Sequence, residues 1–138
     1  MALILDTGPV YASLDRRDTH HAACRALIES TDEALVLPSP VLPEVDYLVA
    51  QRLGVAPMLA LIEDIRQGAY DVEDLTLSDY ERVAELMDRY ADVDLGFVDS
   101  AVIAVAERLG ERRIGTLDRR HFSVVRPRHH DAFELLPG

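Results

Sequence analysis

The sequence predicts an α/β fold, a three-layer sandwich whose central, mostly parallel sheet is flanked by helices. Short uninterrupted apolar runs, typical of strands buried on both faces, occur at residues 2–5, 34–37 and 113–117. Segments with helical periodicity separate these runs. Strands that alternate with helices indicate crossover connections, and therefore a parallel sheet.

Composition is consistent with one domain spanning residues 1–138. No run approaches the roughly 18 apolar residues of a membrane span, so no membrane association is expected. The first residues lack the basic flank of a signal peptide, which favours a cytoplasmic location. The single cysteine, Cys24, excludes an intrachain disulfide. A buried structural role fits Cys24 better than a zinc site shared with His20, because two ligands are too few.

The charge pattern excludes several function classes. The net charge of −11 argues against general nucleic-acid binding by bulk attraction. All 14 basic residues are arginines, so the chain has no lysine. It therefore cannot be a Walker-type nucleotide-binding protein, which needs the lysine of its phosphate loop. Receiver domains and haloacid-dehalogenase-type phosphatases are excluded for the same reason, because both rely on a lysine beside the phosphorylated aspartate. Two interpretations stay open for the arginines of the last third, ion pairs or a phosphate-contacting rim. These arginines are Arg108, Arg112, Arg113, Arg119, Arg120, Arg126 and Arg128.

The first third of the chain reads as strand, helix, helix, strand. The strand at 2–5 stops at Asp6, which can cap a helix over 9–14. A second helix is predicted over 19–28, and a second buried strand over 34–37. An acid at the carboxyl end of a strand lies where open α/β sheets gather ligands.

Helices dominate the middle of the chain. Prolines at 38 and 40 break the chain before a helix over 41–53, which Gly54 ends. Glu44 and Asp46 flank its apolar stripe on opposite sides, and periodicity cannot choose between them. A helix over 56–66 and an edge strand over 70–73 follow.

Two further helices precede the last strands. A capping-box pattern, Ser78 with Glu81, begins a helix over 78–90. The next helix, over 96–109, is amphipathic, with Ser100 and Ala104 assigned to its polar face. Asp99 projects beside its apolar stripe, where a carboxylate is unfavourable unless something pairs with it.

The chain closes with a strand and weaker elements. The strand over 113–117 ends at Asp118, as the first strand ends at Asp6. A helical turn over 118–122 comes next, followed by weak strands over 123–125 and 133–136.

The topology brings distant acids together. Carboxyl ends of parallel strands share one edge, so Asp6 and Asp118 belong to one rim if their strands are neighbours. Glu44 and Asp99 lie in the first turns of helices that start at that rim. Clustered carboxylates repel one another, and a divalent cation resolves the conflict. Oxygen-only ligands favour Mg²⁺ or Mn²⁺ over zinc.

Four segments now match a known pattern. They are LILDTGP (3–9), SPVLPEV (39–45), LGFVDSA (95–101) and GTLDRRHF (115–122), and they cover nearly the whole chain in order. On these segments the chain resembles the PIN-domain ribonucleases, most closely the VapC-type toxins of VapBC toxin–antitoxin modules. The resemblance implies a PIN-like fold and selects Glu44 over Asp46.

The resemblance also assigns roles. It implies that Asp6, Glu44, Asp99 and Asp118 hold the metal and carry catalysis, with Thr7 and Thr116 in support. Some relatives carry another acid at the position of His121, so one or two bound metal ions both stay open.

The implied function is a Mg²⁺- or Mn²⁺-dependent endoribonuclease, the toxin of a type II toxin–antitoxin system. It would hydrolyse RNA phosphodiester bonds, leave a 5′-phosphate and a 3′-hydroxyl, and inhibit translation. The implied partners are a second copy of the chain in a homodimer and a VapB-type antitoxin that reaches the acidic pocket with a basic side chain.

Two other functions fit parts of the pattern. A catalytically silent acidic interaction module would keep the fold, but an idle acidic cluster costs stability. A DNA-directed flap-type nuclease would use the same metal chemistry, but the chain has neither a helical arch nor a separate DNA-binding module.

Overall fold

The computed structural model describes residues 1–138, and its core is a five-stranded, wholly parallel sheet. The strand order is β3-β2-β1-β4-β5. The bounds are β1 (Ala2–Leu5), β2 (Ala34–Pro38), β3 (Asp71–Glu73), β4 (Arg113–Gly115) and β5 (Glu134–Leu136). Because β1 pairs with both β2 and β4, the strands that precede Asp6 and Asp118 are neighbours.

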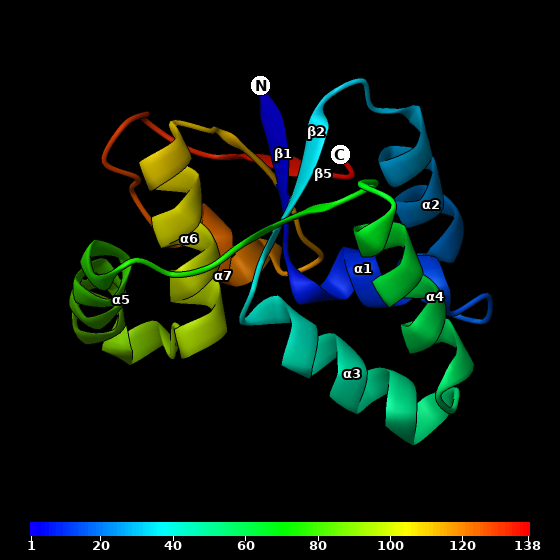
Figure 1. Ribbon diagram of the computed structural model, residues 1–138. Helices are drawn as coiled ribbons and strands as arrows, with labels where there is room; N and C mark the ends of the chain where they lie inside the picture. Colours follow the sequence, from blue (N-terminus) through cyan, green and yellow to red (C-terminus); the bar gives the residue numbers. More distant parts are fainter.

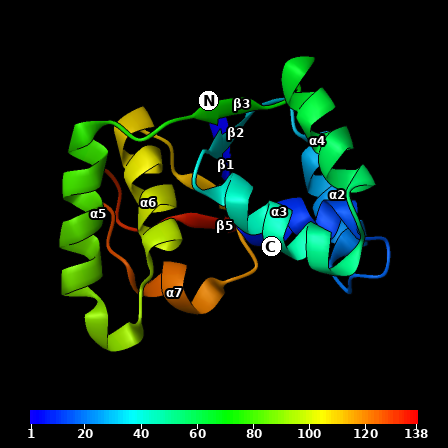
Figure 2. The ribbon, with the colours of Figure 1, turned by 60° about the horizontal axis from the view of Figure 1, so that its bottom comes forward.

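Helices cover both faces of this sheet. Figures 1 and 2 both place α5 and α6 on one side of the strands and α2 and α4 on the other. The helices are α1 (Thr7–Leu14), α2 (His21–Ser30), α3 (Val41–Arg52), α4 (Ala56–Arg66), α5 (Leu77–Arg89), α6 (Phe97–Leu109) and α7 (Arg119–Val124), with a 3₁₀ turn, η1 (Ala91–Val93). The predicted α/β sandwich is therefore confirmed.

Strand β1 lies at the centre because its sequence allows burial on both faces. All four of its residues are buried, and they join one apolar core with Val36 and Leu37 of β2 and Ile114 of β4. The neighbouring Gly115 leaves room for this packing, since a Cβ there would lie 2.7 Å from Leu5 Cδ2. None of the helices is long and apolar enough to cross a membrane.

Three local predictions were wrong. Residues 123–125 do not form a strand, because α7 continues to Val124. Helix α5 begins with a capping box of Thr76 and Asp79, not Ser78 and Glu81. In α6, Ser100 and Ala104 are buried with every residue from 100 to 106, because α5 covers the face that the pattern assigned to solvent.

Three of the seven arginines of the last third form ion pairs. Arg108 pairs with Asp79 and Glu73, Arg113 with Glu33 and Glu134, and Arg128 with Glu85. Arg119 instead donates to the carbonyl oxygens of Leu135 and Pro137. These contacts favour the ion-pair interpretation over a continuous phosphate-binding rim.

The carboxyl edge of the sheet is where four helices begin. Chain segments leave β1, β2 and β4 at this edge and lead into α1, α3 and α7, and α6 starts nearby in Figure 1. The Asp6 amide donates to the Gly115 carbonyl at 2.8 Å, so the pairing of β1 with β4 extends to Asp6 itself. The first residues of several helices that are distant in sequence therefore lie close together at this edge.

Candidate metal centre

Asp6 is fixed at the end of β1 by its neighbours on β4. It is 6 % exposed, and its Oδ2 accepts a hydrogen bond of 2.8 Å from the Thr116 hydroxyl. The same hydroxyl oxygen accepts a 3.0 Å hydrogen bond from the amide of Asp118. Thr116 thus connects the acid that follows β1 to the acid that follows β4.

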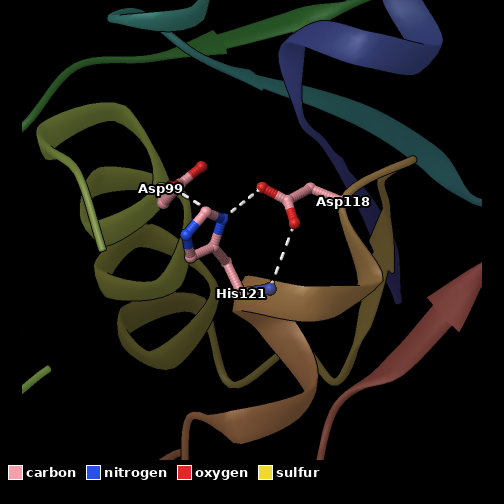
Figure 3. Close-up of side chains that lie close together, drawn as sticks. All are labelled: Asp99, Asp118 and His121. Atoms are coloured by element: carbon pink, nitrogen blue, oxygen red, sulfur yellow. Dashed lines mark hydrogen bonds and ion pairs between the residues drawn. The ribbon is translucent and has the colours of Figure 1, made fainter. Parts of the chain in front are cut away.

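Asp99, Asp118 and His121 form the one group of possible metal ligands whose donor atoms all lie within 4.8 Å of one another, and Asp6 and Glu44 are not part of it. His121 Nδ1 lies 2.5 Å from Asp118 Oδ2 and 3.9 Å from Asp99 Oδ2. Figure 3 draws the three side chains together. Asp99 is in the first turn of α6, where the Gly96 amide donates to its Oδ2 at 3.4 Å. Residues from α6 and α7 therefore meet at one point.

Glu44 reaches the same edge from α3. Its Oε1 accepts a 2.6 Å hydrogen bond from the hydroxyl of Thr7, the first residue of α1. Because Thr7 follows Asp6 directly, this contact ties Glu44 to the end of β1. The alternative acid, Asp46, and the loop acid Asp94 are both exposed and make no side-chain hydrogen bond or ion pair.

The electrostatics of Asp6 and Asp99 reflect crowding. Burial raises the pKa of Asp6 to about 6, and the charges of Asp99 and Glu44 act in the same direction against hydrogen bonds from Thr116 and the Thr7 amide. Burial also raises the pKa of Asp99, and the charges of Asp118 and Glu44 add to this effect. The four predicted acids are therefore close enough for their negative charges to affect one another.

This donor set fits a hard divalent cation. The side chains offer carboxylate oxygens, and the ionised forms of Asp6 and Asp99 are unfavourable without a positive charge nearby. A cation held among them would offset both burial and repulsion. The residues therefore suit the metal that the sequence pattern predicts.

Stability of the metal-free protein should fall as pH rises from about 4 to about 7. Folding raises the pKa of Asp6 from 3.8 to about 6, so the folded state binds more protons in this interval and loses that advantage as Asp6 ionises. The loss is on the order of 3 kcal/mol, since one pKa unit corresponds to about 1.4 kcal/mol. Urea unfolding in EDTA at several pH values measures it. Asp6→Asn should flatten the profile, and an equally steep Asp6→Asn profile would contradict the assignment.

His121 is the member of this group that the sequence analysis left without a role. Its signal was local: Asp118 is the N-cap of α7 and His121 lies three residues later, a spacing that returns a side chain to the capping carboxylate. Asp118 Oδ1 accepts the His121 amide at 3.0 Å, while Oδ2 faces the imidazole. Only the fold shows that Asp99 approaches the same ring nitrogen, at 3.9 Å.

Known proteins share this chain's sequence and fold. The family model of the PIN domain matches residues 3–126. Ribonuclease VapC26 of Mycobacterium tuberculosis is 37 % identical over 135 residues, covering 98 % of this chain and all of that protein. VapC20 of Mycobacterium tuberculosis, described as a sarcin–ricin loop cleaving toxin, superposes with a TM-score of 0.74 at 25 % identity, over 81 % of this chain and 86 % of that one.

A structure of a toxin–antitoxin complex shares the fold at lower identity. VapBC2 from Rickettsia felis, bound to a DNA fragment from its promoter, has a TM-score of 0.70 at 16 % identity, over 98 % of both chains. The matched family region contains all four acids and His121. The chain therefore belongs to the PIN-domain family and is a homologue of the VapC ribonucleases.

Proposed function

We propose that this chain is an endoribonuclease dependent on Mg²⁺ or Mn²⁺, with the ion held by Asp6, Glu44, Asp99 and Asp118. The observation that carries the proposal is the convergence of these acids at one sheet edge, where burial and mutual repulsion raise the pKa of Asp6 and Asp99. When bound, a divalent cation supplies Lewis-acid stabilisation of the charge that develops on a phosphodiester.

The side chains at this site have separate roles in binding the ion, accepting a proton and orienting the ligands. Asp6 and Asp99 are the principal ligands, and Glu44 and Asp118 complete the set or accept a proton from the attacking water. Thr116 orients Asp6 through the 2.8 Å hydrogen bond to Oδ2, and Thr7 orients Glu44. In-line attack on the phosphorus leaves a 5′-phosphate and a 3′-hydroxyl.

Arginines at the far ends of α1 and α3 provide a route for the RNA backbone. Both helices lead from the acidic edge, and α1 rises roughly 10 Å from Thr7 to Leu14 at about 1.5 Å per residue. Beyond α1 lies a hollow of about 600 Å³ lined by Arg16, Arg17 and Arg52, with Asp15 as its one acid. Arginine grips phosphate through paired donors, so this hollow suits a phosphate near the scissile one.

Removing these charges should weaken RNA binding. In an inactive Asp99→Asn background, adding Arg16→Gln and Arg52→Gln should lower affinity about tenfold at low salt and make its salt dependence shallower, by roughly 0.7 in log–log slope per lost phosphate contact. Fluorescence anisotropy with a single-stranded RNA measures both. Arg66→Gln, which removes an exposed arginine of α4, is the control. A salt slope equal to that of the control would contradict this route.

The proposal includes protein partners. Large apolar side chains of α3, α4 and the short connection between them are exposed. They are Tyr47 in α3, Val55 in the connection, and Leu59 and Ile62 in α4. A hollow of about 370 Å³ beside them is lined by Pro43, Glu44, Tyr47 and Leu48, so it reaches a proposed metal ligand. This surface supports binding of a VapB-type antitoxin whose basic side chain enters the acidic centre, and a homodimer. The proposed RNA substrate favours a cytoplasmic location.

One assay separates the candidate functions. Purified protein is incubated with structured RNA and with flap DNA, in Mg²⁺, in Mn²⁺ and in EDTA. We expect cleavage of RNA only, with 5′-phosphate products, and its loss in EDTA. Cleavage of DNA alone would support the flap-type nuclease, and no cleavage of either would support the silent module. Mapping the cleavage ends in total cellular RNA would then identify the substrate.

A further inference from the structure

The orientation of the His121 ring is set from the side away from the acids. Its Nε2 lies 2.8 Å from the carbonyl oxygen of Val93 in η1. A carbonyl oxygen only accepts hydrogen bonds, so Nε2 carries the proton and donates it. In the neutral ring this leaves the lone pair of Nδ1 directed at the carboxylates. Histidine ligands in metalloproteins are held in the same way, with the second nitrogen bonded to a carbonyl or carboxylate.

The other side of the ring requires a positive charge. Nδ1 lies 2.5 Å from Asp118 Oδ2, and Asp99 Oδ2 is 3.9 Å away. A lone pair and a carboxylate oxygen at that separation repel unless a proton or a cation lies between them. Figure 3 shows both carboxylates on the side of the ring that Nδ1 faces, so a single ion could bind all three donors.

We propose that His121 is itself a ligand of the divalent ion, together with Asp99 and Asp118, and that its nitrogen shifts the preference of the centre from Mg²⁺ toward Mn²⁺. The inference rests on the proposed function. Carboxylates suit Mg²⁺ and Mn²⁺ alike, whereas imidazole is a ligand of transition metals. Replacing an oxygen ligand with nitrogen therefore costs Mg²⁺ affinity more than Mn²⁺ affinity.

Pulsed electron paramagnetic resonance on the full chain with Mn²⁺ tests this directly. The wild type should show coupling of the bound Mn²⁺ to a nitrogen, and histidine labelled with ¹⁵N should change that coupling. His121→Gln should lose the coupling, bind Mn²⁺ about tenfold more weakly and keep its Mg²⁺ affinity within about threefold. His130→Gln, at an exposed histidine, is the matched control and should behave as the wild type.

The outcomes separate this inference from the proposed function. Mn²⁺ that binds, is lost in Asp99→Asn and shows no nitrogen coupling would overturn the role of His121 and leave the acidic centre intact. Wild type that binds no Mn²⁺ through Asp99 would overturn both. A purely structural role, tying α7 to η1, would lower the melting temperature of His121→Gln without any coupling in the wild type. If His121→Gln fails to fold, the ¹⁵N labelling of the wild type still decides.

Discussion

Asp99→Asn should reduce RNA cleavage by on the order of a hundred- to a thousandfold, the scale seen when one preorganised electrostatic group is removed from an active site. Asp99 is the acid that α6 contributes to the centre. Its carboxylate lies close to Asp118 and His121, and the charges of Asp118 and Glu44 raise its pKa. The amide keeps the size of the carboxylate but removes the charge that a cation needs. Cleavage rates at saturating Mn²⁺ measure the effect.

The same variant should fold at least as well as the parent. Burial and neighbouring acids raise the pKa of Asp99, so the ionised form is unfavourable and a neutral amide relieves repulsion. In EDTA its melting temperature should equal or exceed that of the wild type. Asp46→Asn, at an exposed acid of α3, is the matched control and should keep full activity. Cleavage by Asp99→Asn at the parental rate would remove Asp99 from the site.

Glu107→Gln should destabilise the protein by roughly 3 kcal/mol, the lower end of the cost of breaking a buried ion pair, because Arg82 keeps a 3.5 Å ion pair with the more exposed Glu85. Arg82 of α5 donates to Glu107 of α6 at 2.8 and 2.9 Å, and the two side chains are 10 % and 7 % exposed. The amide of Arg128 donates to the same carboxylate at 2.8 Å, so the pair also anchors the segment after α7. Urea unfolding at constant pH measures the loss.

Two further variants test the physical reason. Glu63→Gln breaks the exposed pair with Arg66 and should leave the free energy of unfolding nearly unchanged, because surface pairs are well solvated. Replacing both Arg82 with Met and Glu107 with Leu should recover much of the loss, because apolar side chains of similar volume need no partner. A double variant as unstable as Glu107→Gln would mean that packing, not the loss of the buried partner of Arg82, accounts for the effect.

The parallel α/β sandwich could be predicted from the sequence, because buried strands and helices differ in the period of their apolar residues. Asp6 and Asp118 were predicted to share one edge if their strands were neighbours, since both follow strands of a parallel sheet, and the pairing of β1 with β4 meets that condition. Prediction from periodicity failed where a neighbouring helix covers a face that looks polar in one helix alone. Ser100 and Ala104 looked solvent-facing in α6 alone, yet α5 covers them, and the α5 capping box starts two residues earlier than the pattern indicated.

Which side chains face one another depends on the packing of the elements and could not be predicted from the sequence. Glu44 and Asp46 flank the α3 stripe equally in sequence, and the hydrogen bond from Thr7 at the end of β1 distinguishes them. Three arginines of the last third pair with distant carboxylates, in one case 80 residues away. His121 lies 3.9 Å from Asp99 only because α6 and α7 meet at one sheet edge. Distances between side chains depend on how separate elements pack, and a local sequence pattern contains no information about the packing of elements distant in sequence.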